Sequence, residues 1–290
     1  MGQFGELTLG GISFGMIYAA IGLALVLIWR ATRILNYAQG GMAMLTTYIA
    51  LTVISHTGSY WAGFATALAA GLVLGAVIER VVIRPVENKP PLNAVIVTIG
   101  LLIFLEGLAG IIYGGQFRSF PAAFSITGLR QGSLGISSND VFVAGAVLVA
   151  ALALAVVFRY TSAGLRLRAS AFNAQVARLL GVRVGRMLTL GWALAGLIGA
   201  LAGVLVSPST FLYPNSMDSI FVLGFTAAVI GGLDSPAGAV AGGLILGVVL
   251  NYVGGYLGAD LVPLFGLAAL TVVLMVRPSG LFASTGTRQV

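Results

Sequence analysis

Cysteine and histidine, which supply much of the redox, metal and nucleophilic chemistry of enzymes, are nearly missing from this sequence of 290 residues. It contains no cysteine and one histidine, His56, so it offers no thiolate nucleophile and no histidine metal cluster. His56 falls in a short predicted loop without a nearby carboxylate, which argues against a serine–histidine–aspartate set. A glycine-rich phosphate loop ending in Gly-Lys-Ser or Gly-Lys-Thr is also absent. We therefore expect no enzyme activity, no metal and no cofactor bound by this chain.

Glu106 is the one acidic residue well inside a predicted apolar span. A charged carboxylate in lipid is expensive, so Glu106 should face the interior of a helix bundle or carry a proton. A proton-coupled transporter usually needs several such groups, and Glu106 lies in the outer half of its helix. The sequence leaves open whether Glu106 lines a path for solutes.

Two polar segments interrupt apolar runs, at residues 35–41 (LNYAQGG) and at residues 207–219 (SPSTFLYPNSMDS). Irregular backbone at membrane depth is tolerated only where protein or a water-filled path receives it. If the first and last four spans are inverted repeats around the fifth, the two segments occupy matching positions, as in transporters with discontinuous helices. The first segment supplies the predicted pathway residues Asn36, Gln39, Gly40 and Gly41.

The elements that must position these residues are membrane-spanning helices. Hydrophobic residues make up 59% of the chain and charged residues 8%, whereas soluble domains average about 25% charged. A bilayer core needs about 20 apolar residues per helix. The sequence predicts an all-α polytopic bundle of about nine spans, with eight to ten allowed, in one domain covering residues 1–290. The candidate spans are 9–29, 34–55, 60–78, 92–114, 141–158, 187–206, 218–233, 237–257 and 261–276.

The net charge is +7, and the cations gather in alternate loops. This pattern indicates how the chain is oriented in the membrane rather than a nucleic-acid-binding surface. Only Arg118 and Arg130 fall in the other set of loops. The positive-inside rule then predicts an external N-terminus and a cytoplasmic C-terminus. The first apolar stretch lacks a basic leader and a convincing cleavage site, so we expect it to stay in the mature protein.

Two polar segments are long enough for partners, 115–140 outside and 159–186 inside. The outer segment is rich in turn formers and suits either a docking surface or a simple connector. In the inner segment, Ala169–Leu180 predicts one short amphipathic helix with Gly181 as its C-terminal cap. Such a helix could dock in a groove of a soluble partner or lie on anionic lipid.

Glycines recur at four-residue spacing within the spans, which lets helix backbones approach closely in a membrane. Most of them predict tight packing. The pairs are Gly11 with Gly15, Gly71 with Gly75, Gly199 with Gly203, Gly238 with Gly242, Gly243 with Gly247, and Gly254 with Gly258.

Four strings in this order resemble the permeases of branched-chain amino acid ABC transporters along nearly the whole chain. They are ERVVIRPVENKPPLNAVIVTIGL, ASAFNAQVARLLGVRVGRM, VIGGLDSPAGAVAGGLILGVV and VLMVRPSGLF. The resemblance implies a multi-pass subunit of an importer in the bacterial inner membrane. It also implies two ATPase subunits that bind Mg-ATP, a second permease, favoured to be a different chain, and a soluble external substrate-binding protein.

The resemblance also implies roles for particular residues. Residues 169–181 would be the coupling helix in the ATPase cleft, with Arg178 and Leu179 facing the ATPase. The coupling residues would be Ala169, Asn173, Ala177, Arg178, Leu179, Leu180 and Gly181. Gln39 stands where the family carries histidine, so a titratable role there is in doubt and Gln39 could instead adjust substrate preference.

Three other functions stay open at this point. A secondary transporter or channel for small polar solutes shares the apolar composition but would not need the basic cytoplasmic segment. An ABC permease for urea or short amides shares every feature above. A membrane scaffold without transport predicts that changing Asn36 or Gln39 has no effect.

Overall fold

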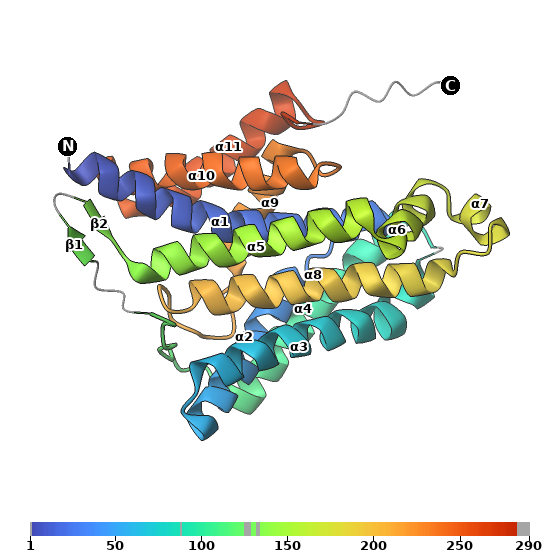
Figure 1. Cartoon of the computed structure of the whole chain (residues 1–290), viewed down its shortest axis with the longest axis horizontal. Helices are drawn as coiled ribbons and strands as arrows, with labels where there is room; N and C mark the ends of the chain where they lie inside the picture. Colours follow the sequence, from blue (N-terminus) through green and yellow to red (C-terminus); the bar gives the residue numbers. More distant parts are fainter. Residues whose placement is uncertain (1, 88, 125–128, 132–133, 283–290) are drawn as a thin grey trace.

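The computed structural model describes residues 2–87, 89–124, 129–131 and 134–282, which form a bundle of long helices (Figure 1). Most helices follow the long axis of the molecule. The helices are α1 (Gly2–Thr32), α2 (Gln39–Thr57), α3 (Tyr60–Ile78), α4 (Pro91–Tyr113), α5 (Ser138–Tyr160), α6 (Ser162–Phe172), α7 (Ala174–Leu179), α8 (Val184–Val206), α9 (Asp218–Gly231), α10 (Pro236–Tyr256) and α11 (Val262–Val276). The other elements of the described residues are a π-helical turn (Glu79–Ile83), two 3-10 turns (Arg84–Val86 and Ala259–Leu261) and a short antiparallel hairpin of β1 (Leu129–Gln131) and β2 (Leu134–Ile136).

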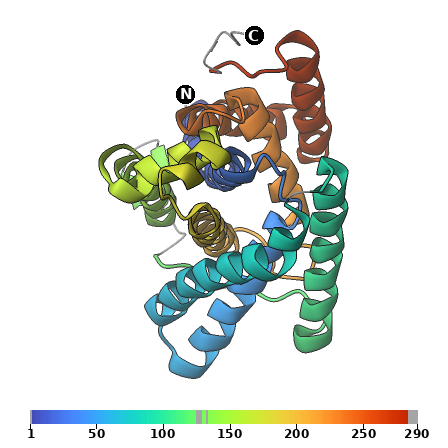
Figure 2. The same ribbon diagram turned by 90° about the vertical axis from the view of Figure 1, so that its right-hand side faces the viewer.

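The first helix is the centre of the bundle. From Met16 to Ile28 it is apolar on nearly every side, and such a helix is stable only when other helices surround it. It packs against α10, α8, α9 and α5. Figure 2 shows α1 in the middle, with α5 on one flank and α4 and α11 on the opposite flank. The flanking helices α4, α5 and α11 are largely exposed, which suits contact with lipid or another membrane subunit.

The all-α polytopic fold is confirmed, and a helix occurs at each predicted span. Among the described residues, seven helices are long and apolar enough to cross a membrane; α9, with 14 residues, is shorter, and α2 is not among the seven. The number of spans therefore stays a prediction. The predicted span 34–55 begins too early, because α2 starts only at Gln39, after the polar break.

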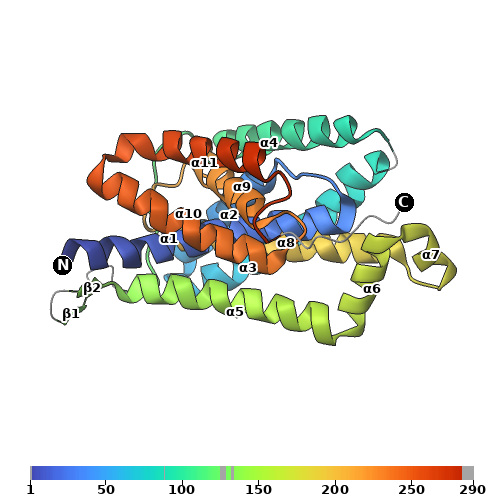
Figure 3. The same cartoon turned by 90° about the horizontal axis from the view of Figure 1, so that it is seen from above.

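The polar segments that were predicted on opposite sides of the membrane lie at opposite ends of the bundle (Figures 1 and 3). At one end, Arg33 pairs with Asp234 of the α9–α10 turn at 2.6 Å, and α6 and α7 protrude nearby. At the other end, Arg118 and Leu212 exchange backbone hydrogen bonds between two loops, and the β1–β2 hairpin lies near the start of α1. The direction in which the bundle crosses the membrane, N-terminus outside, stays a prediction.

Glycine packing occurs where several pairs of helices cross, and two of these crossings match predicted glycine pairs. A methyl group added at Gly71 of α3 would lie 2.5 Å from the Gly196 carbonyl oxygen of α8, which is closer than atoms can approach. Gly15 of α1 and Gly247 of α10 meet in the same backbone-to-backbone way. Gly258 differs from the prediction, because its φ of 125° places it in a turn with open space around it.

Candidate functional site

The break between α1 and α2 is buried inside the bundle rather than exposed as a loop. Asn36 and Gln39 have no exposed surface. The Asn36 side-chain Oδ1 accepts a hydrogen bond from the Ala38 backbone N–H at 3.1 Å, and Asn36 Nδ2 donates to Gln39 Oε1 at 3.0 Å. These bonds replace the helical ones that the break removes, because a buried polar group without a partner would be strongly destabilising.

Gln39 also joins this break to the middle of α8. Its Nε2 donates to the Ala195 carbonyl at 3.0 Å. Ala195 lies about 17 Å from the start of α8, which has 23 residues with a rise of about 1.5 Å each. Gly199 faces the same amide and leaves the room for it, since any side chain at Gly199 would collide with Gln39. The structure therefore brings Asn36 and Gln39 together near mid-depth. Their amides bond to each other and to α8 rather than to an open cavity.

The first turn of α2 contacts two neighbouring helices through its glycines. A methyl group at Gly40 would lie 3.2 Å from the Phe221 Cβ atom, so α2 and α9 begin side by side. Gly41 faces α4, with Leu105 close to it. No side chain caps the start of α2. The two polar segments of the sequence thus meet at this contact between α2 and α9.

Glu106 lies on α4, one residue beyond Leu105, and it is partly exposed. The Asn215 amide donates to its Oε2 oxygen at 3.0 Å, and Asp218 is close enough to interact with it electrostatically. Asn215 and Asp218 are exposed and come from the second polar segment. Glu106 is therefore part of an accessible polar group, which we call the outer polar cluster (Glu106, Asn215 and Asp218). The sequence indicated Glu106 and, separately, the polar segment 207–219 that contains both partners, but not that they meet.

The predicted helix over residues 169–180 is wrong in one respect, because it is two helices. Asn173 leaves the helical conformation, with φ of −152° and ψ of 101°, and its side chain accepts hydrogen bonds from the amides of Gln175 and Val176, both at 3.0 Å. Asparagine is a favoured helix N-cap, so α6 ends and α7 begins at this residue. The role of Gly181 as a C-terminal cap is confirmed, because its φ is 79°. The Gly181 N–H donates to the Arg178 carbonyl, and the Val182 N–H donates to the Ala177 carbonyl.

The surface of α7 is apolar at its tip. Leu179 is 87% and Leu180 76% exposed, and Phe172 at the end of α6 is 95% exposed. Arg178 is also exposed, whereas Ala169 is partly buried. A cavity of about 410 Å³ beside the tip is lined by Leu180, Gly181 and three arginines, which are Arg166, Arg183 and Arg186.

Ala177 corrects the predicted set of contact residues. It is only 2% exposed and packs against Val184 and Leu188 of α8. It therefore cannot touch a partner and instead fixes α7 on the bundle. The exposed members of the predicted set are Asn173, Arg178, Leu179, Leu180 and Gly181.

A buried carboxylate at the base of α3 was not predicted from the sequence. The Glu79 side chain is 1% exposed and accepts from Arg84 at 2.9–3.1 Å and from the Thr189 hydroxyl at 2.6 Å. Arg84 also donates to the Gly185 carbonyl at 2.9 Å. This network ties the α3–α4 connection to the first turns of α8, directly after the α7 segment. The signal available in the sequence was an acid and an arginine five residues apart at the end of a span.

A second acid of this connection lies close to the same region. Burial raises the pKa of Glu87 above its ordinary value, and the nearby Glu79 charge raises it further, while Arg178 and Arg84 lower it. Glu87 is thus within electrostatic reach of α7. This end of the molecule combines an exposed apolar tip, several arginines and a carboxyl whose protonation responds to them.

Comparison with known proteins identifies relatives over nearly the full length. Residues 7–277 match the family described as branched-chain amino acid transport system, permease component. The high-affinity branched-chain amino acid transport system permease protein LivH of Salmonella typhimurium is 31% identical over 285 residues, which cover 93% of this chain and 92% of the relative. LivH of Escherichia coli K12 is 31% identical over 287 residues, with the same coverage.

A solved structure also has a similar fold. It is titled "PsaBC from Streptococcus pneumoniae in complex with Fab", and the alignment covers 94% of this chain and 91% of that chain. The TM-score is 0.51 at 14% sequence identity. At this identity the likeness concerns the fold alone.

Proposed function

The chain belongs to the branched-chain amino acid transport permease family, and from this premise we propose how its own residues divide the work of transport. It is a multi-pass subunit of an ABC importer in the bacterial inner membrane, and it forms the passage for branched-chain amino acids. Its importer includes ATPases and an external binding protein. We propose two ATPase subunits and a second, different permease chain.

We assign coupling to the exposed tip of α7, and this is the observation on which the proposal mainly depends. Leu179 and Leu180 would insert into an apolar groove of an ATPase, since burying two exposed leucines contributes about 1.5–3 kcal/mol each. Arg178 and the three arginines of the adjacent cavity would meet acidic side chains at the rim. The tip protrudes from the bundle and is both apolar and basic, which suits an apolar groove with an acidic rim.

We assign the rest of the coupling route to elements that hold α7 rigidly. Ala177 anchors α7 on α8, and Arg84 joins the start of α8 to Glu79 at the base of α3. A displacement of α7 would therefore move α8 and α3 together. Because Gln39 bonds to the middle of α8, the same displacement would reach the start of α2.

We assign the passage to the region where α2, α4 and α9 meet. The outer polar cluster (Glu106, Asn215 and Asp218) would receive the ammonium group of an amino acid entering from outside, because the carboxyl oxygens of Glu106 and Asp218 can accept hydrogen bonds from it. Further in, Gly40 and Gly41 begin α2 without a side-chain cap, and a helix start attracts a carboxylate. Asn36 and Gln39 would hold that turn in place.

Retention of the ATPases tests the coupling assignment. The full importer carrying Leu179→Glu and Leu180→Glu should lose its ATPases during purification and should lose leucine-stimulated ATP hydrolysis. The matched control is Phe117→Glu, which alters a side chain 69% exposed at the opposite end of the bundle and should retain the ATPases. Normal hydrolysis by the double leucine variant would overturn the assignment. Ala177→Glu is unsuitable, because Ala177 is buried and the change would disturb packing.

A further inference from the structure

A deep crevice lies between α1, α5 and α10, away from the passage. Both α5 and α10 pack against α1 but hardly against each other. The small side chains of Ala151 and Ala155 on α5 and Ala237 on α10 keep the gap open. The crevice encloses about 280 Å³, close to the roughly 300 Å³ at which pockets for small molecules begin, and its lining is almost entirely aliphatic.

The length of the crevice matches one leaflet of a bilayer. It runs along α5 from Leu148 to Phe158, which is about 15 Å at about 1.5 Å per residue. The hydrocarbon core of a bilayer is about 30 Å thick, so each leaflet contributes about half of that. Leu148 lies near the middle of α5 and Phe158 near its end. The crevice therefore covers the depth of a single acyl chain.

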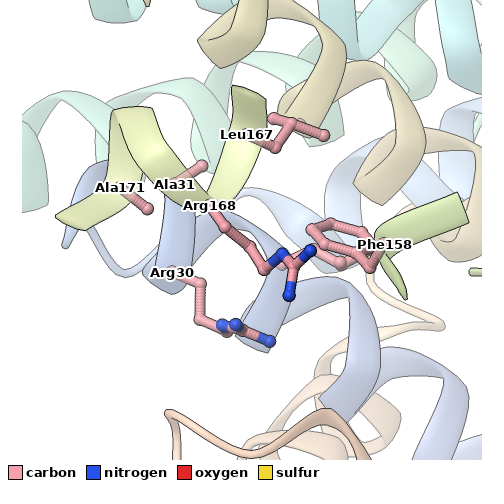
Figure 4. A pocket seen from close by; sticks show the side chains of 8 residues that line it. Arg30, Ala31, Phe158, Leu167, Arg168 and Ala171 are labelled. Atoms are coloured by element: carbon pink, nitrogen blue, oxygen red, sulfur yellow. The ribbon is translucent and has the colours of Figure 1, made fainter. Parts of the chain in front are cut away.

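Two arginines lie at the end of the crevice. Arg30 contributes to its lining, and a smaller cavity that shares Leu27, Arg30 and Phe158 continues to Arg168 of α6. In Figure 4 the side chains of Arg30 and Arg168 extend into the same space, with the Phe158 ring beside them. The Arg30 guanidinium carbon lies 5.9 Å from the centre of that ring.

Neither arginine has an acidic partner of its own. Among the described residues, no carboxylate lies within 4 Å of Arg30 or Arg168, whereas Arg33 pairs with Asp234 at 2.6 Å. The charge of Asp234 attracts Arg30 from a distance, and the charges of Arg168 and Arg33 repel it. Arg30 is partly buried and Arg168 is exposed, and two neighbouring cations that repel one another favour an anion between them. Arginine is well suited to a phosphate group.

We propose that this crevice binds an anionic phospholipid such as phosphatidylglycerol, with one acyl chain along α5 and the phosphate between Arg30 and Arg168. The lipid would fill the gap between α5 and α10 and join α6, which leads into α7, to α1. The proposal commits to a lipid rather than a free anion because the apolar crevice and the arginine pair are continuous. It depends on the membrane location of the chain and on none of the assignments for the passage.

Native mass spectrometry of the delipidated full chain in detergent tests the proposal. The probes are phosphatidylglycerol, phosphatidylcholine and glycerol 3-phosphate. Phosphatidylglycerol should occupy one saturable site more tightly than phosphatidylcholine, and glycerol 3-phosphate should not bind measurably. A basic residue near an anionic lipid surface contributes roughly 1 kcal/mol, or about fivefold in affinity, so Arg30→Gln with Arg168→Gln should weaken phosphatidylglycerol binding about thirtyfold.

Two further variants separate the site from general surface charge. Arg159→Gln removes an exposed arginine that lines neither cavity and should change affinity less than about twofold. Ala155→Phe fills the crevice without changing charge and should weaken the binding of both lipids. If the double arginine variant does not fold, Ala155→Phe and the single variant Arg168→Gln replace it in the test. Native affinity in the arginine or Ala155→Phe variants would overturn the proposal. Equal loss in Arg159→Gln, or binding of glycerol 3-phosphate as tight as that of the lipid, would also overturn it.

Discussion

Replacing Arg84 with methionine should destabilise the chain strongly, because it leaves the buried Glu79 carboxylate without its cation. Glu79 is 1% exposed, and Arg84 supplies three of its hydrogen-bond contacts. Removing one partner of a buried ion pair typically raises the free energy of the folded state by about 3–5 kcal/mol. Only the Thr189 hydroxyl would remain to stabilise the charge.

The converse change should be milder. With Glu79→Leu, the Arg84 side chain, which is 36% exposed, can turn toward water, so we expect a loss of about 1–3 kcal/mol. The double variant should lose less than the sum of the two single changes, since it leaves no unpaired charge in the bundle. The expected coupling energy is about 1–3 kcal/mol.

Unfolding of the purified chain by sodium dodecyl sulfate in mixed micelles measures these differences. The matched control is Arg80→Met, which removes an exposed arginine in the same turn and should change stability by less than about 0.5 kcal/mol. A loss for Arg84→Met no greater than that of the control would refute the reasoning. So would strict additivity of the two single changes.

Three other predictions concern the passage and the coupling end. Glu106→Gln should leave the thermal midpoint unchanged but slow leucine uptake by about tenfold, because one charge-assisted contact of at least about 1.5 kcal/mol is lost; unchanged uptake would contradict the role of the outer polar cluster. Gly199→Ala should destabilise the chain by about 1–3 kcal/mol, because the added methyl group collides with Gln39. The control Gly100→Ala places a methyl group in open space on α4 and should not destabilise it. Equal effects of the two changes in a thermal melt would contradict this explanation. Burial raises the pKa of Glu87 in the folded chain, so the protonated carboxyl favours the folded state. The stability gained at low pH is therefore lost as the pH rises through that pKa. Glu87→Gln should flatten this dependence of the unfolding free energy on pH, and an unaltered dependence would exclude Glu87 as its source.

The sequence predicted the helices well because membrane spans impose long apolar runs, and α1 to α5 and α8 to α11 follow those runs. The polar break at Asn36 and Gln39 was also recognisable, since amides are rare within apolar segments. The partners of these residues were not, because Ala195 and Gly199 lie far away along the chain and their residue types do not show which side chain they contact. The hydrophobic pattern of residues 169–180 suggested one helix, but the hydrogen bonds of the Asn173 side chain divide it.

The crevice of α5 and the Glu79 network show a second limit of sequence patterns. Both depend on which faces of separate helices meet, and apolar composition is nearly the same on every face of α1 and α5. Arg30 and Arg168 were read from the sequence only as markers of orientation. Their shared position beside Phe158 required the packing of α6 against α1.

The central claim is that this chain passes branched-chain amino acids under the control of partner ATPases, and uptake of radiolabelled leucine into proteoliposomes tests it most directly. The importer would be reconstituted with and without its ATPases, its binding protein and ATP. We predict that leucine accumulates only when all three are present and that an imposed ion gradient has no effect. Accumulation without the ATPases, driven by an ion gradient, would contradict the account and identify a secondary transporter.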